Sequence, residues 1–268
     1  MKGIILSGGT ATRLFPLTAT TSKQLLPVYD RQMIFYPLNT LITAGIKEIL
    51  IIVTPDHSGQ YLNLLGDIFK KYKVNLSFNV QKVPRGLPEA FIIGESFIGE
   101  DNVTLILGDN IFEDSVAQQV KNFKKGGHIF VSNVLDPERF GVVKFDSQNN
   151  AEEIIEKPKK WISNYAITGL YIYDNHVIRM AKVLKPSNRK ETEIIDLHKA
   201  YLAKKELCVS ELKGEWLDAG TFDSLLEAGK ISKEKGLSKK FHPIVNKAVA
   251  DFNQEIRAIA KSKLWTNM

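Results

Sequence analysis

The chain has 268 residues, 44% of them hydrophobic and 25% charged, enough for one large α/β domain with a substantial buried core. Its single cysteine, Cys208, excludes an internal disulfide framework and favours a reducing compartment. The formal net charge of +6 lies entirely in residues 230–268, which indicates a solvated helix face or a subunit contact rather than nucleic-acid binding. The apolar start, Ile4–Leu6, is too short for a signal or membrane segment. We therefore expect a cytoplasmic protein that binds neither nucleic acid nor membrane.

Short apolar runs alternate with longer amphipathic stretches in the first part of the chain. The runs, which predict buried strands, are Ile4–Leu6, Ile49–Val53 and Thr104–Leu107. The stretches, which predict helices, are Pro37–Ala44, Tyr61–Tyr72 and Pro88–Phe97. This alternation predicts an α/β fold with a Rossmann-like, mainly parallel sheet flanked by helices. Ligands of such sheets bind beyond the carboxyl ends of the strands, so functional motifs are expected directly after each strand.

The rest of the chain has a different pattern. Longer strand-like stretches separated by turns predict an antiparallel β insertion that carries a second binding site; they are Gly127–Val134, Phe140–Phe145 and Tyr165–Tyr173. From Phe222 onward the pattern is helical, with a break near Gly236 and a last helix over Pro243–Ala260.

A glycine-rich loop, Gly8-Gly9-Thr10-Ala11-Thr12-Arg13-Leu14, follows the first strand. Paired glycines allow a tight turn whose N–H groups can approach an anion, and Arg13 adds a positive charge that suits phosphate oxygens. The loop lacks the Gly-Lys-Ser/Thr of a Walker A motif and the Gly-x-Gly-x-x-Gly of dinucleotide folds. Taken alone, it is explained equally well by an ordinary strand–turn connection.

Two aspartates follow apolar residues 109 positions apart. Asp109 comes after the strand-like Leu105-Ile106-Leu107, and Asp218 stands in Trp216-Leu217-Asp218-Ala219-Gly220. A single aspartate in such a place is more often a turn or helix cap. A converging pair, however, suits Mg²⁺, which prefers one or two carboxylates together with substrate phosphates and waters.

The segment Glu156-Lys157-Pro158 places a charge pair in a loop. Because proline disfavours the helical conformation of the residue before it, we expect Lys157 to be extended and to point into a cleft. A surface salt bridge is the alternative interpretation of this motif.

Together these motifs resemble the glucose-1-phosphate thymidylyltransferase family of sugar nucleotidyltransferases, from Met1 to about Glu227. The segments that carry the resemblance are 1–17, 22–30, 107–112, 136–143, 155–158, 165–173 and 216–221. The resemblance implies an enzyme that uses Mg²⁺ to join dTTP or UTP to glucose 1-phosphate and releases pyrophosphate. It also implies a nucleotidyltransferase domain over 1–229, with a nucleotide-binding half to about 115, a sugar-binding part over about 116–221 and a short helical extension over 230–268.

The resemblance further implies roles for individual residues. The triphosphate would be held by the loop residues Gly8, Gly9, Thr10, Ala11, Thr12 and Arg13, and by Lys23. The pyrimidine would be read by Gln24 and Gln81, close to Gly86. Mg²⁺ would be bound by Asp109 and Asp218. The sugar site would be lined by Phe140, Gly141, Glu156, Thr168 and Trp216. Lys157 would hold the phosphate of the sugar. The catalytic residues would be Arg13, Lys157, Asp109 and Asp218.

Physical chemistry agrees with these implied roles. The attacking group is a phosphate oxygen that is already ionised near pH 7, so no general base is required. The protein must bring two anions together and neutralise the charge of an in-line displacement at the α-phosphorus. This requirement fits the absence of a recognisable nucleophilic triad, since none of the five histidines sits in a matching motif.

Three features depart from the family pattern. Ala11 stands where a glycine is usual, Phe140 stands where a tyrosine is commoner, and the segment after Glu227 is shorter than in long members. A homo-oligomer is still expected. Two alternatives stay open: another enzyme of the same fold, such as an N-acetylglucosamine-1-phosphate uridylyltransferase or a guanylyltransferase, and a non-catalytic nucleotide sensor.

Two structural expectations follow from these departures. Because a positive φ is costly for alanine, Ala11 is expected to have a negative φ. The last helix should pack its apolar stripe on its own domain or on a neighbouring subunit. That stripe consists of Ile244, Val245, Ala248, Val249, Phe252, Ile256 and Ile259.

Overall fold

The computed structural model describes residues 1–9, 11–188 and 190–265, without the side chains of 259–265. The strands are β1 (Lys2–Ser7), β2 (Pro27–Val28), β3 (Arg31–Gln32), β4 (Glu48–Val53), β5 (Asn75–Val80), β6 (Val103–Leu107), β7 (Asn110–Phe112), β8 (Gly127–Asn133), β9 (Gly141–Phe145), β10 (Ala151–Glu156), β11 (Tyr165–Tyr173), β12 (Leu207–Glu211) and β13 (Trp216–Asp218). The α-helices are α1 (Phe35–Thr43), α2 (Ser58–Leu65), α3 (Glu89–Ile93), α4 (Glu95–Ile98), α5 (Ala117–Asn122), α6 (His176–Val183), α7 (Ile194–Ala203), α8 (Phe222–Glu234) and α9 (Pro243–Trp265).

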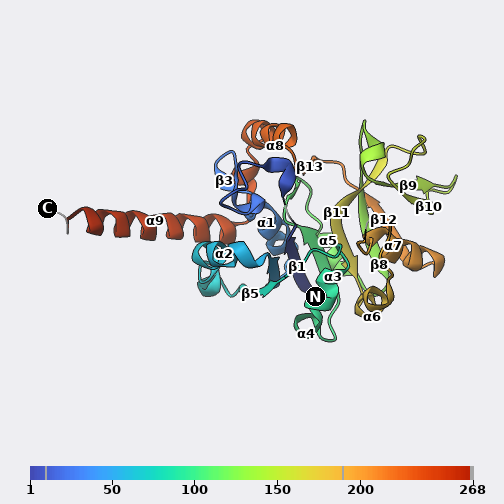
Figure 1. Cartoon of the computed structure of the whole chain (residues 1–268), viewed down its shortest axis with the longest axis horizontal. Coiled ribbons are helices and arrows are strands. Elements are labelled where there is room, and N and C mark those ends of the chain that lie inside the picture. The colour runs from blue at the N-terminus through green and yellow to red at the C-terminus, as the bar shows by residue number, and fades with distance from the viewer. Residues whose placement is uncertain (10, 189, 266–268) are drawn as a thin grey trace.

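One large sheet runs through the molecule in the order β10-β9-β11-β6-β1-β4-β5, and β8 joins β11 to β12 (Figure 1). The strands β6, β1, β4 and β5 are parallel to one another. β11 runs antiparallel to β6, β8 and β9. The predicted fold class is therefore confirmed, and the antiparallel strands continue the parallel sheet instead of forming a separate one.

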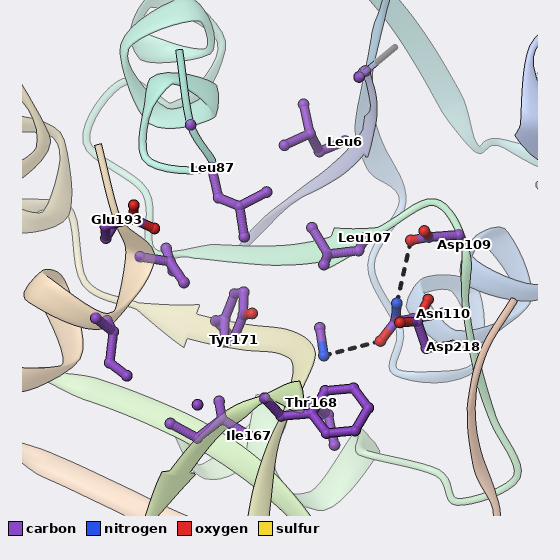
Figure 2. Close-up of a pocket in the computed structure, with 18 of the residues that line it drawn as sticks. Leu6, Leu87, Leu107, Asp109, Asn110, Ile167, Thr168, Tyr171, Glu193 and Asp218 are labelled. Atoms are coloured by element: carbon purple, nitrogen blue, oxygen red, sulfur yellow. Dashed lines mark hydrogen bonds between the residues drawn. The ribbon is translucent and has the colours of Figure 1, made fainter. Parts of the chain in front are cut away.

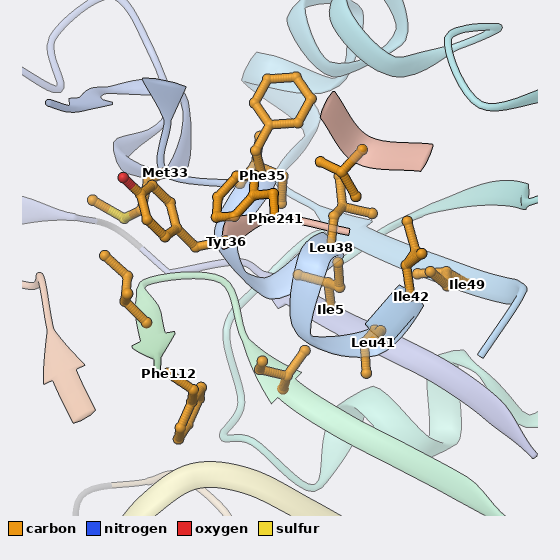
Figure 3. Packing of buried hydrophobic residues seen from close by; sticks show 14 of the residues in the cluster. Ile5, Met33, Phe35, Tyr36, Leu38, Leu41, Ile42, Ile49, Phe112 and Phe241 are labelled. Atoms are coloured by element: carbon orange, nitrogen blue, oxygen red, sulfur yellow. The ribbon is translucent and has the colours of Figure 1, made fainter. Parts of the chain in front are cut away.

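Apolar side chains cover both faces of the parallel strands. In β1, Ile5 packs in one cluster with Leu38 and Leu41 of α1 (Figure 3). Ile4 and Leu6 point to the opposite face and pack in a second cluster. This burial on both faces explains why β1 is almost continuously apolar, since successive side chains of a strand alternate between faces. The same burial holds the carboxyl end of β1 in place, and the glycine-rich loop begins directly after it at Gly8.

Two predicted helices are shorter than expected. The segment Tyr61–Tyr72 contains the end of α2 and, after turns from Gly66, a 3₁₀ turn over Lys70–Tyr72. The segment Pro88–Phe97 is divided into α3 and α4 at Gly94. A Cβ at Gly94 would lie 2.9 Å from Ile4 Cδ1 and 3.3 Å from Leu50 Cδ2, so glycine here permits close packing on the sheet.

The C-terminal prediction is confirmed for secondary structure, because α8 and α9 are separated at Gly236, whose φ is +60°. Val245, Ala248 and Val249 are buried against the body of the protein. Farther along, α9 projects away from the body (Figure 1), and Ile256 is 50% exposed. The predicted packing therefore holds for the first half of the helix, and the side chain of Ile259 lies outside the described residues.

None of the helices described in the structure is long and apolar enough to cross a membrane. The division into a domain over 1–229 and an extension over 230–268 stays a prediction.

Candidate active site

A cavity of about 510 Å³ lies where the carboxyl ends of β1 and β6 face the strands β9, β10 and β11. The sequence-assigned residues that line it are Gly8, Gly9, Arg13, Lys23, Gln24, Gln81, Gly86, Asp109, Phe140, Gly141, Glu156, Lys157, Thr168, Trp216 and Asp218. Ala11 and Thr12 are not among its lining residues, and Thr10 lies outside the described part of the chain. The structure thus brings together residues that are up to 210 positions apart.

The glycine-rich loop turns tightly at the end of β1. Gly9 has a φ of +94°, which glycine adopts without strain. A Cβ at Gly8 would lie only 2.3 Å from Gln81 Oε1. Gly8 therefore leaves room for the Gln81 amide at the wall of the cavity.

Ala11 contradicts the expectation from the sequence, because its φ is +48° and its ψ is +27°. The prediction of a negative φ was wrong. The carbonyl oxygen of Ala11 accepts hydrogen bonds from the Leu14 N–H (3.1 Å) and from Thr18 Oγ1 (3.0 Å). These two bonds hold the left-handed conformation, which costs an alanine about 1–2 kcal/mol. The loop therefore keeps its turn although a side chain replaces the usual glycine hydrogen.

Two glutamine side chains have their amide groups oriented by neighbours. Gln24 Oε1 accepts hydrogen bonds from Ser22 Oγ (2.6 Å) and from the Tyr61 hydroxyl (3.3 Å). Gln81 Nε2 donates to Glu89 Oε2 at 2.7 Å. Because one end of each amide is fixed, Gln24 offers its NH₂ group and Gln81 offers its carbonyl oxygen to the cavity.

The two aspartates converge through a short antiparallel ladder. β7 and β13 pair so that Asp218 stands opposite Asn110, and the Ala219 N–H donates to the Asp109 carbonyl oxygen at 3.0 Å. In Figure 2 the side chains of Asp109, Asn110 and Asp218 lie together at one end of the cavity. Segments far apart in sequence thus place two carboxylates side by side.

The two carboxylates have different electrostatic surroundings. Burial alone would raise the pKa of Asp109, but the Lys23 ammonium paired with it outweighs burial and lowers that pKa. Burial raises the pKa of Asp218, and the negative charge of Asp109 raises it further, against the opposing charges of Lys23 and Arg13. Two buried negative charges side by side repel each other unless positive charge lies nearby, and the Lys23 ammonium supplies part of that positive charge.

Asn110 connects the carboxylates with the opposite wall. Its Nδ2 donates to Asp109 Oδ1 at 3.2 Å, and its Oδ1 accepts from the Gly169 N–H at 3.0 Å (Figure 2). The same oxygen accepts from Trp216 Nε1 at 2.6 Å. One amide therefore holds β7, β11 and β13 together. A Cβ at Gly169 would lie 2.5 Å from Asn110 Oδ1, which explains the glycine in the middle of β11.

The other end of the cavity is built by β9 and β10, where Glu156 stands opposite Gly141. Phe140 packs its ring edge-on against Trp216, with centroids 5.1 Å apart. Lys157 is exposed at the cavity, and its N–H donates to the Phe140 carbonyl oxygen at 2.9 Å. Its φ is +45°, so the prediction of an extended conformation was wrong. The chain turns sharply here because β10 ends at Glu156, and the hydrogen bond to Phe140 holds that turn.

Comparison with known proteins decides the family. A family model described as nucleotidyl transferase matches residues 2–235. The chain belongs to the nucleotidyl transferase family. A glucose-1-phosphate thymidylyltransferase of Neisseria meningitidis is 51% identical over 234 residues, which are 85% of this chain and 81% of that protein. A glucose-1-phosphate thymidylyltransferase of Mycolicibacterium smegmatis is 50% identical over 233 residues, which are 85% of this chain and 81% of that protein.

Solved structures agree with this family membership. A Bacillus anthracis protein crystallised with sucrose and described as a glucose-1-phosphate thymidylyltransferase is 41% identical, with a TM-score of 0.82 over 87% of this chain and 95% of that one. A UDP-glucose pyrophosphorylase complexed with UDP-glucose is 23% identical, with a TM-score of 0.76 over 87% of this chain and 98% of that one. The latter supports the fold alone. The chain is thus a nucleotidyltransferase enzyme of nucleotide-sugar biosynthesis.

Nucleotidyltransferases of this family generally use a divalent metal ion. Within the described residues, no three His, Cys, Asp or Glu side chains gather as a metal cage. Asp109 and Asp218 offer two carboxylates, so phosphate oxygens and waters would complete the shell. This donor set fits an ion that is held partly by its substrate.

Several residues at the cavity of this nucleotidyltransferase carried no recognisable signal in the sequence. Thr192 closes the cavity from another loop, where its N–H donates to the Arg85 carbonyl oxygen at 2.8 Å and its carbonyl leaves no room for a Cβ at Gly86. His198 of α7 is fully buried, and burial lowers its pKa to about 3, so it carries no charge near pH 7. The residues missed by sequence reasoning are Leu6, Pro84, Leu87, Leu107, Asn110, Arg139, Ile167, Gly169, Tyr171, Glu191, Thr192, Glu193, Ile194, Ile195 and His198. Seven of these, Leu6, Leu107, Asn110, Arg139, Ile167, Gly169 and Tyr171, lie within the segments that carry the family resemblance, and the others lie outside them.

Proposed function

We propose that the enzyme transfers a thymidylyl group from dTTP to glucose 1-phosphate, giving dTDP-glucose and pyrophosphate. The observation that carries the proposal is one cavity that holds the glycine-rich loop with Arg13, two adjacent carboxylates and, on the opposite wall, Glu156 and Lys157. The names of the relatives support the choice of dTTP and glucose 1-phosphate.

In the proposed reaction, a phosphate oxygen of glucose 1-phosphate attacks the α-phosphorus of dTTP. The bond from that oxygen to the α-phosphorus forms while the bond between the α-phosphorus and the bridging oxygen of pyrophosphate breaks. No proton must be removed from the attacking group, so the enzyme acts by positioning and by charge neutralisation. Lys157 would hold the sugar phosphate, and Arg13 would stabilise the departing pyrophosphate.

We propose Mg²⁺ as the divalent ion, held by Asp109 and Asp218. Its chemistry is to neutralise charge on the phosphate oxygens during the displacement. The role of the protein is to keep the two carboxylates adjacent. Asn110 supports this arrangement, since it bonds to the Asp109 carboxylate and, through Trp216, to the strand that carries Asp218.

The base would be read by Gln24 and Gln81. Thymine and uracil present a carbonyl acceptor next to the N3–H donor. The carbonyl would accept from the NH₂ of Gln24, and the N3–H would donate to the carbonyl oxygen of Gln81. Cytosine has an unprotonated N3 that would face the same carbonyl oxygen. The fixed amides therefore favour dTTP and UTP over CTP.

The sugar would occupy the end lined by Phe140, Gly141, Glu156, Thr168 and Trp216, with Glu156 accepting hydrogen bonds from sugar hydroxyls. Phe140 has no hydroxyl of its own, so it would contribute an apolar ring edge rather than a hydrogen bond.

The direct test is to incubate the protein with dTTP, glucose 1-phosphate and Mg²⁺ and to measure pyrophosphate and dTDP-glucose. We expect both products in equal amounts, with no pyrophosphate when glucose 1-phosphate is omitted. Parallel reactions use N-acetylglucosamine 1-phosphate with UTP and mannose 1-phosphate with GTP. A higher kcat/KM in either of these reactions, or no product in any reaction, would contradict the proposal in favour of a related transferase or a nucleotide sensor.

We also propose that the enzyme is a cytoplasmic homo-oligomer. The exposed free thiol of Cys208 fits a reducing compartment. The projecting half of α9 exposes Ile256, and a short helical end without packing is only marginally stable in water. Light scattering on the purified protein should give a mass above that of one 30.2 kDa chain; a monomer at micromolar concentration would contradict this proposal.

A further inference from the structure

Lys23 forms an ion pair with Asp109 inside the cavity. Both side chains are largely buried, with 13% of Lys23 and 11% of Asp109 exposed. Charges attract more strongly where water is excluded than at a surface. The pair is therefore a substantial interaction, unlike the exposed ion pairs elsewhere on the protein.

The surroundings of Lys23 fix its backbone and leave its side chain as the element that can move. Lys23 begins a 3₁₀ turn, in which its carbonyl oxygen accepts from the Leu26 N–H at 3.0 Å. The next residue, Gln24, is held by Ser22 and Tyr61. Lysine carries its charge at the end of a flexible four-carbon chain, so the ammonium can change partner without any change in the turn.

We propose that Lys23 couples metal binding to triphosphate binding by occupying Asp109 until the triphosphate arrives. In the empty enzyme the Lys23 ammonium neutralises the carboxylate that a metal ion would need. When a triphosphate is bound, its oxygens give the ammonium a second anion, and Asp109 becomes available. This inference rests on the proposed function, because it takes Asp109 as a metal ligand and the cavity as a triphosphate site.

Electrostatics supports this exchange. Lys23 pairs with Oδ2 of Asp109, and Asn110 donates to Oδ1. An ammonium and a divalent cation at one carboxylate repel each other, so the ion binds more weakly there while Lys23 stays paired. Without nucleotide, the displaced ammonium would lose its partner in a largely buried place, which is strongly unfavourable. With nucleotide, the ammonium gains phosphate oxygens. Metal and triphosphate should then each increase the affinity of the other.

The test measures binding of Mn²⁺, as a probe for the metal site, by the loss of the free-ion electron paramagnetic resonance signal. Wild-type protein is titrated with and without a dTTP analogue that has a methylene bridge between the α- and β-phosphorus atoms. We expect the analogue to increase Mn²⁺ affinity at least tenfold. In Lys23→Met, Mn²⁺ without nucleotide should bind at least tenfold more tightly than in wild type, and the further gain from the analogue should shrink.

Lys157→Met is the matched control, because it removes another lysine of the cavity, and it is Lys23, not Lys157, that pairs with Asp109. It should leave nucleotide-free Mn²⁺ affinity unchanged. Lys23→Gln provides a second neutral variant, and Lys23→Arg retains the charge and should bind free Mn²⁺ as weakly as wild type. Unchanged or weaker Mn²⁺ binding in the folded neutral variants, without nucleotide, would overturn the inference. Failure of wild type to bind the dTTP analogue in calorimetry would instead overturn the proposed function.

Discussion

Asp109→Asn and Asp218→Asn should each lower kcat by about a thousandfold or more. A metal ion contributes several kcal/mol of charge stabilisation in the transition state, and about 1.4 kcal/mol corresponds to each factor of ten in rate. Asp218 ends β13 opposite Asn110, and Asp109 directly precedes Asn110, so each variant removes one of the two adjacent carboxylates proposed to hold the ion. Pyrophosphate release at saturating substrates measures the effect.

The same two variants should differ in stability. Asp109 has a lowered pKa because of Lys23, so Asp109→Asn loses a favourable pair and leaves a largely buried ammonium. Asp218 has a raised pKa because of burial and of Asp109, so its charge opposes folding at neutral pH. Asp218→Asn should therefore melt at the same or a higher temperature, and Asp109→Asn at a lower one.

Asp223→Asn is the matched control for these variants. Asp223 is an exposed residue of α8, only five positions after Asp218 and away from the cavity. It should keep wild-type turnover. If either cavity variant, shown to be folded by circular dichroism, turned over within tenfold of wild type, the metal assignment would be wrong.

The second large effect concerns the choice of nucleotide. We expect dTTP and UTP to react with kcat/KM values at least tenfold above those of CTP, ATP and GTP, a gap of about 1.4 kcal/mol or more. Purines are disfavoured because the resemblance described above assigns Gln24 and Gln81 to a pyrimidine base. CTP is disfavoured because the carbonyl oxygen of Gln81 would face an acceptor, and unpaired buried polar groups are costly.

Glu89 offers a sharper test, because it fixes the orientation of the Gln81 amide through the 2.7 Å hydrogen bond. In Glu89→Leu the amide can rotate and present its NH₂ to cytosine. The ratio of kcat/KM for UTP over CTP should then fall about tenfold, as expected for the loss of roughly 1.4 kcal/mol. Glu89→Gln keeps an acceptor and should preserve the ratio. Equal ratios in wild type and Glu89→Leu, or a preference of wild type for GTP, would contradict this account of base reading.

Three of the four parallel strands, β1, β4 and β6, could be predicted because they are buried on both faces. Such strands are continuously apolar, and the loops after them meet at one edge of the sheet. That rule located the glycine-rich loop and Asp109 from sequence alone. β5 was missed because it has mostly half-buried and exposed residues, such as Asn75 and Asn79, and so lacks the apolar run that marks a buried strand.

The cavity wall could not be predicted in the same way. Thr192, Glu193 and His198 reach the cavity through the position of α7 and the loop before it, which depends on tertiary packing. The conformations of Ala11 and Lys157 were wrong for a related reason. Local propensity assigns both residues a negative φ, and hydrogen bonds from distant or neighbouring segments override it.

The ladder between β7 and β13 has a consequence for synthesis of the chain. Asp109 leaves the ribosome more than a hundred residues before Asp218, and β13, which aligns the two carboxylates, is the last strand among the described residues. A nascent chain that ends before β13 would already contain the glycine-rich loop, Lys23 and Asp109, and could pair the charges of Lys23 and Asp109. It would lack the second carboxylate and the Trp216 that closes onto Asn110. Activity should therefore appear only after β13 has been synthesised, and products that end before Trp216 would be inactive proteins rather than partly active enzymes.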